Sequence, residues 1–111
     1  VIYTSRQLMT LSSQEASLAF SAKISAALAV IVKRIGTRPR FLIAKGGITS
    51  SDVGTLGLGV KRALVLGQVR PGIPVWKLGE ESKFPGMSYV IFPGNVGSID
   101  TLRELVEMFN E

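Results

Sequence analysis

The stretch Phe41–Asp52 constrains the fold of this chain more than any other. An apolar run, Phe41–Ala44, leads into the glycine pair Gly46-Gly47, and hydroxyl side chains and one carboxylate follow at once. This order is typical of a buried strand, a tight turn and the first turn of a helix. Free backbone N–H groups at a helix start suit a phosphate, although Thr49 and Asp52 also have the spacing of a capping box, which needs no ligand.

The rest of the chain predicts an α/β fold. Strands are expected where β-branched and aromatic residues cluster, and helices where apolar residues recur every three or four positions. We expect a mostly parallel or mixed sheet with helices packed on its faces, in which glycine-rich strand-to-helix loops form a ligand site. The predicted strands are Val1–Thr4, Phe41–Ala44, Val60–Val69, Pro74–Leu78 and Tyr89–Phe92; the predicted helices begin near Ser13, near Ser50 and after Ser98, and Arg6–Leu11 is predicted as a loop.

The first predicted helix has both a capping signal at its start and apolar residues at helical spacing. Ser12 and Glu15 form a Ser-x-x-Glu capping box at its start. One apolar stripe at helical spacing predicts the face that packs against the rest of the domain. The stripe consists of Phe20, Ile24, Ala27, Leu28, Ile31 and Ile35.

A second glycine-rich loop resembles the first in its surroundings. Pro93–Ser98 follows the predicted strand Tyr89–Phe92 and precedes an amphipathic helix. Ligands of open α/β sheets bind beyond the carboxyl ends of the strands, where two such loops can share one crevice. The pair of loops therefore predicts a phosphate or nucleotide site.

Several classes of function are excluded or made unattractive by composition. The 111 residues contain no cysteine and no histidine, so the chain itself holds no disulfide, thiolate metal site or His-based triad. The net charge of +5 invites nucleic acid, but the basic residues are scattered and no nucleic-acid motif occurs. Trp76 could stack on a base, although a strand tryptophan is more often core or interface. We expect no nucleic-acid partner, no membrane span, no targeting signal and a cytoplasmic location.

Four segments together resemble the C-terminal nucleotide-binding domain of the four-carbon acid sugar kinases. They occur in the family's order, and the resemblance covers essentially the whole chain, most sharply from Pro39 to Gly97. The segments are Phe41–Asp52, Gly57–Ala63, Pro71–Trp76 and Phe92–Gly97.

The resemblance implies the ATP-binding portion of a kinase that phosphorylates 3-oxo-tetronate, threonate or erythronate, with Mg²⁺ accompanying ATP. Residues 1–111 would be one nucleotide-binding domain of a longer kinase, whose absent N-terminal domain binds the sugar acid and supplies the catalytic residues, so this chain alone is expected to be inactive. A homo-oligomeric assembly is compatible with this resemblance. The alternative is a non-catalytic nucleotide- or anion-binding or assembly module with the same fold. The resemblance assigns ATP contacts to Gly46, Gly47, Ile48 and Thr49 in the first loop and to Gly94, Asn95 and Gly97 in the second.

Overall fold

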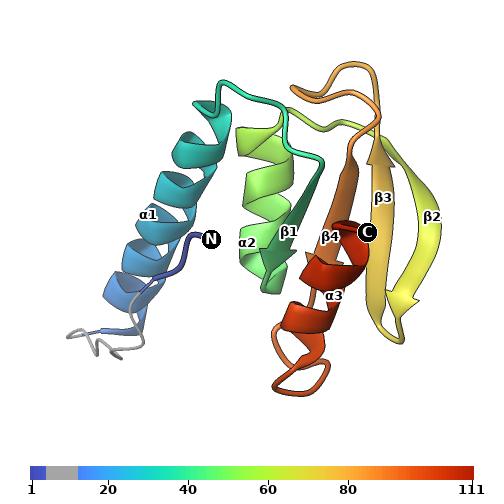
Figure 1. The fold of residues 1–111 in the computed structure, drawn as a ribbon. Helices are drawn as coiled ribbons and strands as arrows, with labels where there is room; N and C mark the ends of the chain where they lie inside the picture. The colour runs from blue at the N-terminus through green and yellow to red at the C-terminus, as the bar shows by residue number, and fades with distance from the viewer. Residues whose placement is uncertain (5–12) are drawn as a thin grey trace.

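The chain folds into a mixed sheet with helices on both faces, as the sequence predicts (Figure 1). The computed structural model describes residues 1–4 and 13–111. A short π-helical turn, η1, directly continues helix α2. In chain order the elements are α1 (Gln14–Lys33), β1 (Phe41–Lys45), α2 (Gly47–Asp52), η1 (Val53–Gly57), β2 (Ala63–Arg70), β3 (Ile73–Leu78), β4 (Ser88–Phe92) and α3 (Thr101–Phe109).

The strand order places the ends of β1 and β4 side by side. The four strands lie in the order β1-β4-β3-β2, with β1 and β4 parallel and the other two pairs antiparallel. Phe41 lies opposite Ser88, and Lys45 lies opposite Phe92. Because parallel strands run in the same direction, the loops after β1 and β4 leave the sheet at one common edge, the lower edge in Figure 1.

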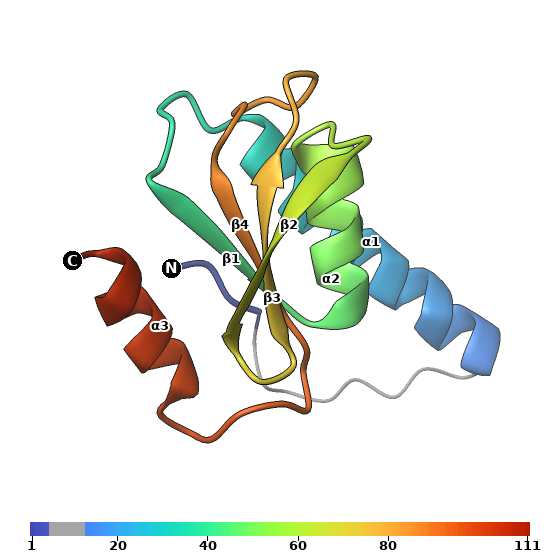
Figure 2. The same ribbon diagram turned by 90° about the vertical axis from the view of Figure 1, so that its right-hand side faces the viewer.

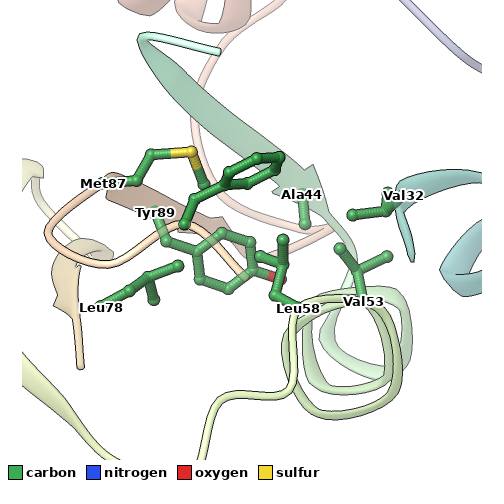
Figure 3. Packing of buried hydrophobic residues seen from close by; sticks show 8 residues of the cluster. Val32, Ala44, Val53, Leu58, Leu78, Met87 and Tyr89 are labelled. Carbon is green, nitrogen blue, oxygen red and sulfur yellow. The ribbon is translucent and has the colours of Figure 1, made fainter. Parts of the chain in front are cut away.

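Two apolar clusters hold the layers together. Helices α1 and α2 and turn η1 lie on one face of the sheet, and α3 lies on the other (Figure 2). Figure 3 shows the first cluster, in which the ring of Tyr89 lies among Leu58, Leu78 and Met87. The second cluster, on the α3 side, consists of Ile73, Val75, Val90, Phe92 and Leu105.

The backbones of turn η1 and helix α1 lie unusually close to each other at Gly57. A Cβ atom on Gly57 would lie 3.0 Å from the carbonyl oxygen of Ala29 and 3.3 Å from Cβ of Val32. Only glycine leaves room for this approach. The π-type bond that widens η1 runs from the N–H of Leu58 to the carbonyl of Val53, at 2.9 Å.

This close approach corrects the predicted packing face of α1. The fully buried residues of the helix are Ser25, Ala29 and Val32. Ile24 and Ile31, which belong to the predicted stripe, are 37% and 43% exposed. Small side chains face η1 because the two backbones nearly touch there. Leu28 and Ile35 of the predicted stripe do pack against the first apolar cluster, so the predicted face was only partly correct.

The start of the chain differs from prediction. Val1–Thr4 forms no strand; these residues line a cavity along the free edge of β1 but are not paired with it. A strand that short gains little without a full set of ladder bonds to a neighbour. The N-cap of α1 is Ser13, whose Oγ accepts from the N–H of Ala16 at 3.0 Å. Helix α1 thus begins where expected, while Ser12 and the predicted loop Arg6–Leu11 lie outside the described residues.

Helix α1 is also long and apolar enough to cross a membrane, judged by length and composition alone, which the sequence analysis did not anticipate. A buried helix of a globular domain or a signal sequence meets the same criterion. One side of α1 packs on η1 and α2, whereas Leu18, Val30 and Ile31 stay exposed on the helix surface.

Candidate nucleotide site

The two glycine-rich loops predicted from the sequence lie together at one edge of the sheet. The N–H of Gly46 donates to the carbonyl of Phe92 at 2.7 Å, which joins the ends of β1 and β4. The ammonium of Lys45 donates to the carbonyl of Gly94 at 3.4 Å and lies 4.9 Å from the centre of the Phe92 ring. The two loops therefore start side by side beyond the carboxyl ends of two parallel strands, where ligands of open α/β sheets bind.

The first loop presents a row of backbone N–H groups. Gly46 has φ 103° and ψ 141°, a conformation essentially restricted to glycine, and α2 begins at the next residue. The first intrahelical bond runs from the N–H of Ser50 to the carbonyl of Gly46, at 2.8 Å. Gly47, Ile48 and Thr49 therefore have no intrahelical acceptor for their N–H groups. Their amides can serve an anion.

Two predictions about this helix are wrong. It starts at Gly47 rather than near Ser50, and its N-cap, Gly46, makes no side-chain bond, so Thr49 and Asp52 do not form a capping box. Asp52 instead accepts a hydrogen bond from Oγ of Ser25 at 2.7 Å. The carboxylate ties α2 to α1, and this tertiary partner could not be read from local spacing.

The side chain of Ser50 anchors the first loop by contacting its backbone carbonyls. Its buried hydroxyl lies 2.6 Å from the carbonyl oxygen of Gly46 and 2.9 Å from that of Ala44. The hydroxyl of Tyr89 donates to the Ser50 carbonyl at 2.6 Å, and burial raises the pKa of Tyr89 well above its usual range. The tyrosine therefore stays neutral and keeps donating at physiological pH.

The second loop is held differently. Gly97 has φ 85°, and a Cβ there would lie 2.8 Å from Oγ1 of Thr101. That Thr101 oxygen accepts from the N–H of Ser98 at 2.7 Å, which closes the loop onto the start of α3. Gly94 and Asn95 are exposed and precede α3 by several residues, so they lie in a loop rather than at a helix start.

The glycines of the two loops fall into two kinds. Gly46 and Gly97 are required by their positive φ angles. Gly47 and Gly94 lack a positive φ, and a Cβ on either would meet no described atom within 4 Å. The protein's own packing thus gives no reason for glycine at these two positions. Gly36 shares these two features at a distant position, so they do not by themselves indicate a ligand. At Gly47 the open space lies beside free amides and leaves room for the phosphates of a nucleotide.

An open groove leads away from the first loop along α2 and η1. Its volume is about 420 Å³, and Gly47 lines one end of it. Trp76, from β3, lines the groove; it is half-buried and packs against the first apolar cluster. The sequence analysis missed the groove because its lining residues come from distant segments with no shared motif. They include Ser51, Gly54 and Thr55 from α2 and η1, and Ala63 and Val65 from β2.

Metal-binding side chains do not gather here. Across residues 1–4 and 13–111, no group of three or more histidine, cysteine, aspartate or glutamate side chains could hold a metal ion. A Mg²⁺ ion arriving with a nucleotide can take its ligands from phosphate oxygens and water.

Comparison with known families identifies the class of protein. The family model described as "nucleotide-binding C-terminal domain" matches residues 1–102. The chain belongs to this family, in agreement with its resemblance to the C-terminal domain of the four-carbon acid sugar kinases. Searches of curated proteins and of solved structures found no match.

Proposed function

We propose that this chain is the ATP-binding domain of a kinase that phosphorylates four-carbon acid sugars such as 3-oxo-tetronate, threonate or erythronate. Family membership supports nucleotide binding. The choice of ATP and of sugar-acid substrates rests on the sequence resemblance in the four segments named above. A separate N-terminal domain would bind the sugar acid and supply the catalytic residues, and this domain would hold ATP and Mg²⁺.

One observation carries the proposal: three consecutive amides without intrahelical acceptors, at the start of α2, lie next to the second glycine-rich loop at a common edge of the sheet. In the proposed complex, the amides of Gly47, Ile48 and Thr49 and the Thr49 hydroxyl bind phosphate oxygens. Gly94, Asn95 and Gly97 form the opposite wall. Phosphoryl transfer asks a protein mainly for positioning and charge stabilisation, which such amides provide.

Lys45 supplies a cation between the two walls. Its ammonium is exposed, and its bond to Gly94 is long at 3.4 Å, so a phosphate can compete for it. A lysine acts here as a point charge on a flexible stem and does not need a fixed geometry.

The test is a titration of the chain with ATP, with and without Mg²⁺, followed by backbone amide shifts. We expect saturable shifts centred on residues 46–49 and 94–97. Shifts confined to other residues would refute the assigned site. An unchanged spectrum of the folded chain would refute nucleotide binding by these loops alone and would favour the non-catalytic alternative.

A charge variant provides the matched control. Gly47→Asp places a carboxylate beside the free amides and should abolish the ATP-induced shifts. Gly36→Asp makes the same chemical change at another glycine that has open space around it and no positive φ. It should leave binding intact. Substrate choice is then tested on the full-length protein by ATP-dependent phosphorylation of the three sugar acids.

A further inference from the structure

We propose that the groove along α2 and η1 is the subsite for the base and ribose of a purine nucleotide, with Trp76 as the stacking platform. This inference rests on the proposed function, because it places the rest of the molecule whose phosphates lie on the glycine loops.

Continuity with the first loop is the first argument. Gly47 lines the groove and also carries one of the three free amides. A nucleotide with its phosphates at the first loop can direct its remaining atoms into solvent, into the cavity along β1 that Lys45 and Thr49 line, or along this groove; only the groove is lined by Gly47. Helix α2 and turn η1 together span eleven residues, about 16 Å at the helical rise, which accommodates a nucleoside.

The shape and chemistry of the walls suit a planar ring. A volume near 420 Å³ lies in the range of small-molecule pockets, which are mainly apolar with a few polar groups. Trp76 and Ile91 provide apolar surface from the sheet, and Val65 adds to it from β2. Across the groove, Ser51 and Thr55 provide hydroxyl groups within reach of a ribose.

Trp76 is held in place as a platform should be. Its ring packs against that of Tyr89, with centroids 6.4 Å apart and planes inclined by 57°. Tyr89 is itself fixed by burial and by its bond to Ser50. A half-buried indole with a fixed support loses little conformational entropy when a base stacks on it.

The far end of the groove carries hydrogen-bond donors. Lys61 and Arg62 line it, and no carboxylate pairs with either side chain in the described part of the chain. Their backbone N–H groups donate to one oxygen of Glu81, at 3.0 and 2.9 Å, which fixes the rim. Cationic donors suit the acceptor nitrogens on the edge of adenine, such as N7.

Tryptophan fluorescence tests the assignment directly, because Trp76 is the only tryptophan in the chain. The chain is titrated with ATP and, in parallel, with inorganic tripolyphosphate, and binding of each is followed independently by amide shifts at residues 46–49. We expect ATP to quench Trp76 and tripolyphosphate to bind without quenching. Binding of ATP without any change at Trp76 would overturn the base subsite and leave the phosphate site standing. Failure of both ligands to bind would overturn the proposed function as well.

Two neighbouring residues of β2 provide matched variants. Val65 lines the groove and is 61% exposed, whereas Leu64 does not line it and is 62% exposed. Val65→Gln should weaken ATP binding several-fold and leave tripolyphosphate binding unchanged; Leu64→Gln should change neither. Trp76→Leu, which keeps apolar packing but removes the ring, should weaken ATP binding on the order of tenfold. Equal ATP affinity in the Val65 and Leu64 variants would contradict the subsite.

Discussion

The loops after β1 and β4 both connect a strand to a helix through glycines, but they differ in structure. Each has one glycine with a positive φ, Gly46 or Gly97, and one that is free of backbone and packing demands, Gly47 or Gly94. The first loop passes at once into α2 and has a buried anchor in Ser50, whereas the second crosses several exposed residues before α3.

This difference indicates that the two loops contribute unequally to ligand binding. Three consecutive amides on a fixed helix start can bind an anion without rearrangement, so the first loop should contribute most of the affinity. The exposed second loop can adjust to the ligand at the cost of ordering itself. Variants of the paired glycines can test this comparison.

The largest effect is expected from Gly47→Asp compared with Gly94→Asp. The first change should weaken Mg-ATP binding by at least roughly a hundredfold, because it removes charge-assisted bonds worth about 1.5–3 kcal/mol each. The second should cost about tenfold. Isothermal titration calorimetry of both variants measures the ratio, and equal losses would mean that the loops share the phosphate equally.

The glycines with positive φ should affect stability instead. Gly46→Ala and Gly97→Ala should each lower the free energy of unfolding by about 1–3 kcal/mol, since an L-residue is strained there. Gly97→Ala should cost the more, because its Cβ would meet Thr101. Gly47→Ala and Gly94→Ala are the controls and should stay within about 0.5 kcal/mol. Urea denaturation distinguishes these outcomes; a destabilised control pair would remove the argument for a ligand at those sites.

The anchor under the first loop should have an intermediate effect. Ser50→Ala removes the hydroxyl that bonds two backbone carbonyls and should destabilise the chain by about 1–2 kcal/mol. Nucleotide affinity should also fall, because the amides of the first loop lose their support. Thr55→Ala is a suitable control: its hydroxyl bonds a single exposed carbonyl, that of Ser51. An equal change in both variants would contradict the anchoring role.

The smallest expected effect is on the stability of the fold at low pH, through Glu81. Hydrogen bonds from the backbone of Arg62, then from Glu81 itself and from Lys61, hold the pKa of Glu81 below its usual value of 4.5. A lowered folded-state pKa means that the carboxylate stabilises the fold above pH 4.5 and that this contribution disappears as the pH falls through the lowered value. Glu81→Gln should therefore reduce the loss of stability between neutral pH and pH below 4.5, measured by urea denaturation. An identical acid response in the wild type and the variant would show that Glu81 does not fix this rim.

Local sequence patterns were sufficient for the four strands of the sheet and for the two glycine-rich loops, but not for Val1–Thr4, which forms no strand. Continuous apolar runs such as Phe41–Ala44 form buried strands because a strand covered on both faces has no polar side, and glycine pairs end them because other residues resist the required backbone. The two loops were therefore predictable, and so was their meeting at one edge, given a mixed sheet.

The tertiary structure decided the features that depend on distant partners. Asp52 has the spacing of a cap, yet it binds Ser25, 27 residues away. The most deeply buried face of α1 follows from the missing side chain of Gly57, and the apolar stripe predicted only its partly buried neighbours Leu28 and Ile35. The groove beside Trp76 is lined by residues of α2, η1, β2 and β3, which only the packing of the layers brings together. Sequence periodicity reports which residues prefer burial, but the partner that buries them, and the space left open, are fixed only when the layers pack.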